Sequence, residues 1–388
     1  MSDPPGKNRK LSVCFVTGTR AEFGLMRTTL RAIQAHPKLQ LQLLVTGMHL
    51  HARHGRSIDV VRDEGWKIDA VVPWKLAGHK PSVHAKQTGL AMAGLASAFS
   101  SLASDVVLVV GDRVEAFAAA GAAHLSHRAV AHVHGGDRAV GQVDDSLRHA
   151  ITKLAHVHFP ATAQSAARIL RLGEDRWRVH RVGSPGIDGI VPDAAAPARM
   201  RERFPKLAAR RYALIVLHPV VSSGKVEYGR ADELLSAVQD AGIEQTVVIY
   251  PNNDPGSHNI IACWERRRRQ ITYLLRDVSR DVFLGLLHDA AVLVGNSSSG
   301  IIEAASFGMP VVDVGPRQLG RERGENVTAV PYGKEPVRRA VAKIWNDGRA
   351  TRFPRRNVYE GSGTGRKIAD ALARLRIDER LLRKRIDY

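Results

Sequence analysis

The chain has 388 residues, 57 Lys and Arg against 38 Asp and Glu, and only two cysteines, Cys14 and Cys263. Its length exceeds the size at which a single hydrophobic core usually keeps growing, so we expect two domains. The cysteine content excludes a disulfide framework and indicates a reducing, cytoplasmic setting. No apolar run reaches the roughly 18 residues that a membrane-spanning helix requires, and the polar start indicates a loose tail rather than a secretion signal.

The net charge of +19 favours anionic partners. Nucleic acid is the obvious candidate, but the basic residues are spread along the chain and aromatic residues make up only 5%. There is also no basic-aromatic platform and no recognised nucleic-acid motif. We therefore expect no nucleic acid and no membrane partner, and a small anionic substrate instead.

In the first half, apolar runs rich in β-branched residues alternate with segments of helical apolar spacing. Repeated units of this kind predict a parallel sheet with helices on both faces. The turn after the first run, GTRAEFG, lacks the GxGxxG spacing of a dinucleotide fingerprint, so nicotinamide binding loses its main support. The predicted strands are residues 11–17, 39–46, 68–72, 106–110, 130–133 and 157–160, and the helical segments are 25–33, 84–101, 114–124 and 145–155.

A proline- and alanine-containing connector at residues 187–198 precedes a second α/β series. Two consecutive blocks of similar size predict two Rossmann-like, doubly wound domains with a cleft between them. We place these domains at residues 1–188 and 189–366, followed by a long amphipathic helical pattern toward the end of the chain. The predicted strands of the second series are residues 212–217, 246–250, 272–274, 291–294 and 310–314.

The stretch from residue 292 to residue 326 carries the strongest functional signal. An apolar run is followed by a small-residue loop at 295–300 and then by helical spacing over 301–307. The free N–H groups, serine hydroxyls and positive dipole end at such a helix start suit a phosphate or diphosphate. Capping alone is the alternative, although three successive serines exceed what a cap needs. Glu303 is either a solvated helix position or an acceptor for sugar hydroxyls.

Acidic residues follow the strands of the first half. Asp112, Asp137 and Asp144 are expected on one rim of the sheet, where ligands of open α/β sheets usually lie. Carboxylates placed there suit proton transfer if burial or a neighbouring like charge gives them different pKa values. The alternative for Asp144 is that it, or Asp145, caps the next helix.

Histidines are numerous in the first half, but their spacing matches no standard metal-ligand motif, so we do not expect metal catalysis. In the second half, His218 and Asn252 each follow a predicted strand. His218 either donates to a phosphate or packs at the strand end. A later loop brings Arg317, Arg321 and Arg323 toward the same ends of the strands.

Taken together, these segments make the sequence resemble the hydrolysing UDP-N-acetylglucosamine 2-epimerases, particularly their sialic-acid and legionaminic-acid branch. The ordered set of motifs carries the resemblance from about residue 13 to residue 327. The matching segments are TGTRAEFGLM, VTGMHL, GDRVEAFAAA, HVHGGD, DDSLRHAITKLAHVHF, LGE, VGSPGID, LHPV, YPNNDPGS, GNSSSGIIEAASFGMPVV and GPRQLGRERGENV.

The resemblance implies a glycosyltransferase-B-like architecture with UDP in the cleft, and a terminal helix, residues 367–388, packing back on the first domain. It also implies elimination of UDP to a glycal followed by hydration to the free 2-epimer, without a cofactor. The substrate is UDP-N-acetylglucosamine or its 2,4-diacetamido-trideoxy counterpart. A UDP-sugar glycosyltransferase of the same fold is the alternative. Family members often pair, so we expect a homo-oligomer, a dimer or a tetramer.

The resemblance also assigns roles to individual residues. In the second domain it implies nucleotide contacts by Ser297, Ser298, Glu303 and Arg317, with Glu303 as the ribose acceptor, and cleft positions for His218 and Asn252. In the first domain it implies diphosphate-side positions for Arg20 and Arg113, with Gly24 in the same motif as Arg20, and catalytic carboxylates at Asp112 and Asp144.

One position departs from the family pattern. Many relatives carry a catalytic Glu where this chain has His134. Either His134 takes over the proton transfer, for which an unperturbed imidazole is well suited, or Asp137 does. A third possibility is that His134 orients Asp137.

Overall fold

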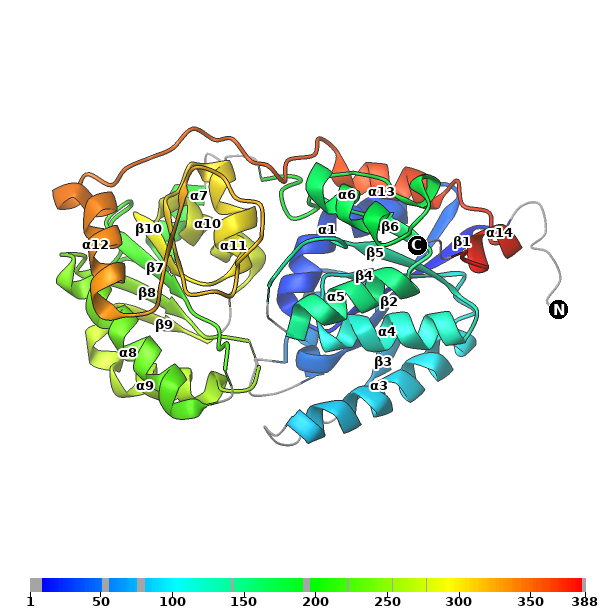
Figure 1. The fold of residues 1–388 in the computed structure, drawn as a ribbon, viewed down its shortest axis with the longest axis horizontal. Coiled ribbons are helices and arrows are strands. Elements are labelled where there is room, and N and C mark those ends of the chain that lie inside the picture. Colours follow the sequence, from blue (N-terminus) through cyan, green and yellow to red (C-terminus); the bar gives the residue numbers. More distant parts are fainter. Residues whose placement is uncertain are drawn as a thin grey trace. The chain divides into compact units, whose positions relative to one another are not determined.

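Two six-stranded parallel sheets organise the chain, and each belongs to its own unit. The computed structural model describes residues 9–50, 56–74, 81–140, 143–190, 196–221, 223–252, 254–276 and 278–385. Unit 1 comprises Met1–Asp137, Val143–Asp188 and Tyr359–Tyr388, and unit 2 comprises Arg138–Gln142 and Gly189–Val358. Figure 1 labels most helices and strands of both units. The predicted α/β class is confirmed.

The sheet of unit 1 has the strand order β3-β2-β1-β4-β5-β6. Successive side chains of a strand point to opposite faces, and both faces of β1 are covered. Val13 and Phe15 accordingly enter one core cluster, whereas Cys14 and Val16 enter another. The strands are β1 (Leu11–Thr17), β2 (Leu39–Thr46), β3 (Ala70–Val72), β4 (Val106–Val110), β5 (Ala129–Val133) and β6 (Val157–Phe159).

Helices cover both faces of this sheet. The first helix begins with a capping box, in which the Thr19 hydroxyl accepts the Glu22 N–H and the Glu22 carboxylate accepts the Thr19 N–H. α1, α2 and α13 pack on one face, and α3, α4 and α5 pack on the other. The helices are α1 (Arg20–Ala35), α2 (Ile58–Asp63), α3 (Pro81–Ser101), α4 (Val114–Leu125), α5 (Val143–Leu154), α6 (Ala163–Arg171), α13 (Thr364–Leu372) and α14 (Glu379–Leu382), with 3-10 turns η1 (Gly47–Leu50) and η3 (Arg176–Arg178).

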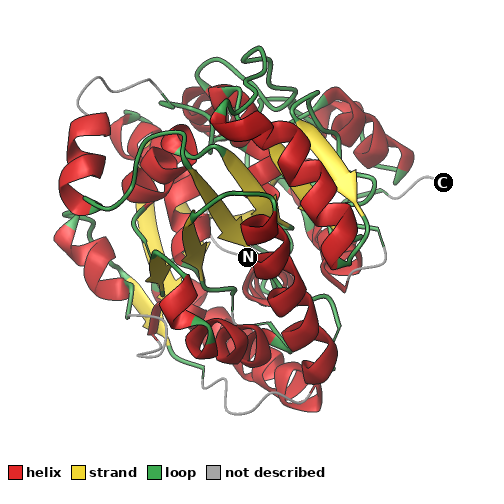
Figure 2. Ribbon diagram, turned by 90° about the vertical axis from the view of Figure 1, so that its left-hand side faces the viewer, coloured by secondary structure: helices red, strands yellow, loops and turns green. Residues whose placement is uncertain are grey.

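The sheet of unit 2 repeats this plan with the order β12-β11-β10-β7-β8-β9. Alternate residues of its central strand again enter different cores, Ile215 on one face and Leu214 on the other. Figure 2 shows the yellow strands with red helices beside them. The strands are β7 (Tyr212–Val216), β8 (Gln245–Ile249), β9 (Tyr273–Leu275), β10 (Val292–Gly295), β11 (Val311–Val314) and β12 (Val327–Val330).

In unit 2, α8, α9 and α12 pack on one face of the sheet, and α7, α10 and η5 pack on the other. The helices are α7 (Ala196–Arg203), α8 (Gly224–Asp240), α9 (Ser257–Arg266), α10 (Arg280–Asp289), α11 (Ser298–Ile302) and α12 (Lys334–Trp345), with 3-10 turns η4 (Arg268–Gln270), η5 (Ala304–Phe307) and η6 (Asn346–Gly348).

Every predicted strand is present, with ends that differ by at most two residues. β12 is not predicted, because Thr328 and Ala329 at its centre are exposed and no apolar run marks it. The chain end differs as well. α13 ends at Leu372, and a separate helix, α14, begins after Asp378, whose carboxylate accepts the Leu381 N–H. Residues 359–366, which we assigned to the second domain, group with unit 1.

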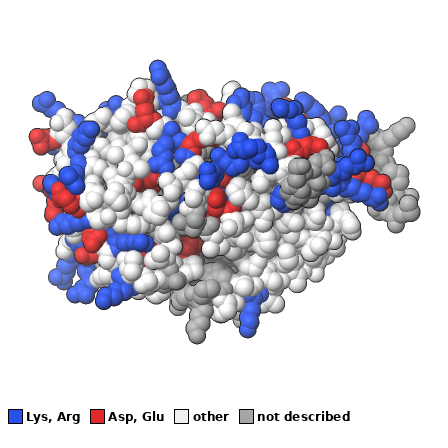
Figure 3. Space-filling model, in the orientation of Figure 1, with Lys and Arg blue, Asp and Glu red and all other residues white. Residues whose placement is uncertain are grey.

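Lys and Arg side chains lie over elements of both units on the face that Figure 3 shows, with fewer acidic side chains among them. Within the described ranges, none of the helices is long and apolar enough to cross a membrane.

Candidate active site

Polar side chains gather at the carboxyl ends of adjacent strands in each unit. In unit 1, Asp112 follows β4 and His134 follows β5, the next strand in the sheet. In unit 2, His218 follows β7 and Asn252 follows β8, again on neighbouring strands. The carboxyl edge of an open parallel sheet is where ligands usually bind, so each unit offers one candidate region.

Asp112 forms an ion pair with Arg148 of α5, whose side chain is only 2% exposed. Arg148 also donates through Nη1 to the carbonyl oxygen of His134, at 3.0 Å. Asp144 lies in the first turn of α5, four residues before Arg148 and therefore on the same side of the helix. One buried guanidinium thus connects the loops after β4 and β5 with the helix that carries Asp144.

His134 and Asp137 are buried against each other. Nδ1 of His134 lies 3.2 Å from Oδ2 of Asp137, and Nε2 lies 2.9 Å from the Ser184 hydroxyl. The second carboxylate oxygen of Asp137 accepts the Ser165 hydroxyl at 2.7 Å. His134 has a positive φ of 62°, a backbone conformation that non-glycine residues rarely adopt. Both ring nitrogens are therefore engaged inside unit 1, in a strained loop that surrounding contacts hold.

The residues of unit 1 that the resemblance places near the diphosphate lie at the starts of α1 and α4. Arg20 is the first residue of α1 and is half-buried, whereas Gly24 is buried one turn further on. Arg113 precedes α4, and its Nε donates to Oε2 of Glu115 at 3.3 Å. β1 and β4 are adjacent strands, so both helix starts lie at the same edge of the sheet.

Asn296, the residue after β10, organises the candidate region of unit 2. Its side chain accepts the His218 N–H at 2.7 Å and donates to the His218 carbonyl at 2.9 Å, so it joins the end of β10 to the end of β7. The His218 Nδ1 accepts the Asn252 N–H at 3.2 Å. In neutral His218 the proton is therefore on Nε2, which makes that nitrogen a donor.

The helix after the small-residue loop is shorter than predicted. α11 spans only five residues, Ser298–Ile302, and continues as the 3-10 turn η5. Ser297 is its N-cap, and its hydroxyl accepts the Ser299 N–H at 3.4 Å, so the capping role is present. Ser298 is half-buried. The Asn296 carbonyl accepts Arg317 Nη1 at 3.1 Å and Gln318 Nε2 at 2.9 Å, which fixes the arginine loop beside this turn.

Glu303 is buried, with its side chain 6% exposed, and it forms a 2.8 Å ion pair with Arg280 of α10. A solvated helix position, one of the two alternatives for Glu303, is thereby excluded.

Arg323 forms a 3.2 Å ion pair with Asp313 at the end of β11. Burial raises the pKa of Asp313 to about 6, although Arg323, Arg317 and Arg321 act against this shift.

A family model described as UDP-N-acetylglucosamine 2-epimerase matches residues 31–373. The chain belongs to the UDP-N-acetylglucosamine 2-epimerase family. The resemblance inferred from the ordered motifs is confirmed, and so is the prediction of an enzyme of the hydrolysing 2-epimerase class. The glycosyltransferase alternative is not better supported by any relative.

Two relatives and one structure illustrate the similarity. The UDP-N,N'-diacetylbacillosamine 2-epimerase (hydrolyzing) of Legionella pneumophila is 34% identical over 96% of this chain and 98% of that protein. The UDP-N-acetylglucosamine 2-epimerase of Neisseria meningitidis is 32% identical over 90% of each chain. A crystal structure of UDP-GlcNAc 2-epimerase from Neisseria meningitidis bound to UDP-GlcNAc has a TM-score of 0.78 at 19% identity and covers 93% of this chain and 99% of that one. The glycosyltransferase-B-like fold is confirmed.

Three residues of the candidate site, Arg148, Ser184 and Asn296, are not predicted from the sequence. Arg148, Ser184 and Asn296 act through buried contacts with predicted residues, and only the fold brings them there. The one available signal is position, because Asn296 directly follows an apolar run and Ser184 lies in the VGSPGID motif.

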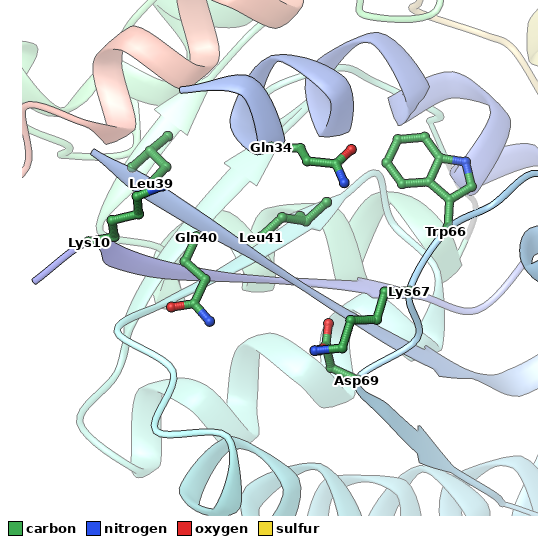
Figure 4. Close-up of a pocket in the computed structure, with 8 residues that line it drawn as sticks. All are labelled: Lys10, Gln34, Leu39, Gln40, Leu41, Trp66, Lys67 and Asp69. Atoms are coloured by element: carbon green, nitrogen blue, oxygen red, sulfur yellow. The ribbon is translucent and has the colours of Figure 1, made fainter. Parts of the chain in front are cut away.

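One pocket of unit 1 lies away from these residues. It has a volume of about 310 Å³ and is lined by side chains near the amino ends of β1 and β2, including Lys10 and Leu39 (Figure 4). This is the opposite end of the strands from Asp112 and His134, so we do not connect it with the epimerase chemistry. Within the described part of the chain, no group of three or more His, Cys, Asp or Glu side chains forms a metal site.

Proposed function

We propose that the chain catalyses the hydrolytic 2-epimerisation of a UDP-2-acetamido sugar. A base removes the proton from C2 while the bond from C1 to the UDP oxygen breaks, and the electron pair left at C2 forms the C1–C2 double bond of a glycal. Water then adds its oxygen to C1, and a proton returns to C2 on the opposite face. UDP and the free 2-epimer are released.

The catalytic side of this proposal rests on unit 1. The observation that carries it is the ion pair of Asp112 with the buried Arg148, with Asp144 on the same helix face as Arg148. We assign proton transfer at the sugar ring to Asp112 and Asp144. Because both ring nitrogens of His134 face Asp137 and Ser184, we assign His134 the role of orienting Asp137.

The nucleotide side of the proposal rests on unit 2. His218, whose Nε2 is the donor nitrogen, and the turn at Ser297 and Ser298 are assigned to the diphosphate. Arg317, which donates to the turn at Asn296, adds positive charge next to it. Glu303 is assigned to the ribose hydroxyls. We also assign Asn252 and, in unit 1, Arg20, Gly24 and Arg113 to substrate binding.

The substrate class follows from the relatives. One acts by name on UDP-N,N'-diacetylbacillosamine and another on UDP-N-acetylglucosamine, at similar identity. We propose a UDP-linked 2-acetamido sugar of one of these two kinds, used in sialic-acid or legionaminic-acid biosynthesis. The two cysteines, both buried and free, support a cytoplasmic location. A homo-oligomer stays a prediction, which sedimentation of the purified chain would test.

A substrate panel without acceptor tests the proposal. The purified chain is incubated separately with UDP-N-acetylglucosamine and with its 2,4-diacetamido-trideoxy counterpart, and UDP and free sugar are quantified. We expect equimolar UDP and free 2-epimer from one of the two. UDP release only after an acceptor is added, with the sugar transferred to it, would contradict epimerisation and establish the glycosyltransferase alternative.

A further inference from the structure

Two glutamates outside the assigned catalytic set lie at the point where the strand order of unit 1 reverses. β1 is flanked by β2 on one side and β4 on the other, and this divergence is the usual ligand position of a doubly wound sheet. Glu22 lies in the first turn of α1, directly after β1, and Glu115 lies in the first turn of α4, directly after β4. Both side chains therefore belong to the same edge.

Both glutamate side chains reach Gly18, next to the end of β1. Glu115 is 1% exposed. A Cβ on Gly18 would lie 2.4 Å from Cγ of Glu115, and a Cβ on Gly47 would lie 2.9 Å from the same atom. Both glycines are thus needed to leave room for this side chain. Glu22 reaches the same place from the other side, because its Oε2 accepts the Gly18 N–H at 2.9 Å.

Each carboxyl group uses only one of its oxygens. Oε2 of Glu22 accepts two backbone N–H groups, and Oε2 of Glu115 accepts Nε of Arg113. Oε1 of both residues is buried and, among the described residues, lacks a hydrogen-bond partner. Two adjacent ionised carboxylates with unsatisfied buried oxygens are costly, whereas a single proton held between them removes one charge.

We propose that Glu22 and Glu115 form a proton-sharing carboxyl pair that positions Arg113 and the Gly18–Thr19 turn for the substrate. Glu115 forms the ion pair with Arg113, and Glu22 carries the proton. Only the kinetic test of this proposal depends on the proposed function. The protonation of the pair does not.

Electrostatics agree with this geometry. Burial, followed by the charge of Glu115, raises the pKa of Glu22 to about 8, while Arg113 acts in the opposite direction. Titratable and charged groups of the neighbouring elements include Arg20 of α1, His49 of η1 and Asp112 after β4, which is paired with Arg148. Burial lowers the pKa of His49 to about 4, so its protonation does not change near pH 8. Ionisation of Glu22 then places a second negative charge next to that of Glu115.

The kinetic test compares wild type, Glu22→Gln and Glu115→Gln as full chains. In wild type, KM is expected to rise about tenfold per pH unit above the transition, as a single ionisation dictates, while kcat changes little. Glu22→Gln, whose amide imitates the neutral acid, should fold and abolish this rise. Glu115→Gln should raise KM at every pH, because Arg113 loses its ion pair with the Glu115 carboxylate. Glu379→Gln, an exposed glutamate of α14, is the matched control and should behave as wild type.

A second measurement needs no substrate. Infrared difference spectra of the free protein between pH 7 and pH 10 should contain the carbonyl band of a protonated carboxylic acid, and Glu22→Gln should lose it. A spectrum without this band, or a band unchanged in Glu22→Gln, would overturn the proton-sharing pair. An unchanged pH profile of KM in Glu22→Gln would overturn the positioning role. Absence of epimerase activity in wild type would instead refute the proposed function and leave the infrared result to decide on the pair.

Discussion

Asp112 and Arg148 show how a reactive carboxylate is held at the sheet edge. Arg148 is buried and bonded both to Asp112 and to the His134 carbonyl, so the aspartate has one defined position. Strand-end position alone predicts Asp112 as a candidate. The sequence does not predict its partner, since the pairing depends on how α5 packs against β5.

We expect Asp112→Asn to lower kcat by about 10²- to 10⁴-fold, the range typical of a lost acid or base. UDP binding should change little, because we assign Asp112 to proton transfer and not to the diphosphate or the ribose. Steady-state kinetics and UDP titration calorimetry would measure both effects, with Asp59→Asn, which alters an exposed side chain of α2, as the control. Wild-type turnover in Asp112→Asn would remove this residue from the mechanism.

Asn296 acts at the same scale in unit 2. Asn296→Ala removes the partners of the buried His218 N–H and C=O, so we expect a loss of about 2–4 kcal/mol in the free energy of unfolding and weaker UDP binding. The matched control is Asn326→Ala. Asn326 is similarly buried but donates one side-chain hydrogen bond, to the Met309 carbonyl near the amino ends of the strands. Denaturant titration and calorimetry test this, and equal UDP affinities of the two variants would contradict it.

At the scale of elements, the sequence predicts the strands well and the helix ends poorly. Strands buried on both faces read as continuous apolar runs, as in residues 106–110. The helix predicted over 301–307 is instead divided at Glu303 between α11 and η5, and Gly308 ends η5 with a positive φ. At the point of division, the Ile302 carbonyl accepts Asn357 Nδ2 and Glu303 pairs with Arg280. Tertiary contacts of this kind have no counterpart in a local apolar pattern.

The segment containing α14 is attached to unit 1 by a buried charge cluster. Lys384 donates to Glu174 at 2.7 Å, and Glu174 also lies 3.0 Å from His158. Although burial opposes the shift, hydrogen bonds and charges from His158 and Lys384 lower the pKa of Glu174 to about 2. Since this is below the ordinary value of 4.5, the stabilisation is present above pH 4.5 and is lost as the pH falls toward 2.

We therefore expect the free energy of unfolding of wild type to decrease between pH 4.5 and pH 2 more steeply than that of Glu174→Gln. Glu379→Gln, which alters an exposed pair within α14, should follow wild type. Thermal unfolding monitored by circular dichroism across this range would measure the difference. Parallel curves for wild type and Glu174→Gln would show that the cluster does not stabilise the chain end.

At the scale of the whole molecule, composition and periodicity predict two Rossmann-like units. The ordered motifs, rather than any single one, predict the 2-epimerase family. Contacts inside each unit show how the side chains are held. Asp112 is fixed by Arg148, His218 by Asn296, and Glu303 by Arg280. None of these three partners follows from residue spacing, because each comes from a different strand or helix.

Solvent isotope incorporation tests the central claim most directly, since only elimination and rehydration exchange the hydrogen at C2. The purified wild-type chain is incubated with the active UDP-2-acetamido sugar in deuterated water, and the free sugar is analysed by proton NMR and mass spectrometry. We predict one deuterium at C2 of the free 2-epimer, formed together with UDP. A released sugar that keeps its original hydrogen and configuration at C2 would contradict the account.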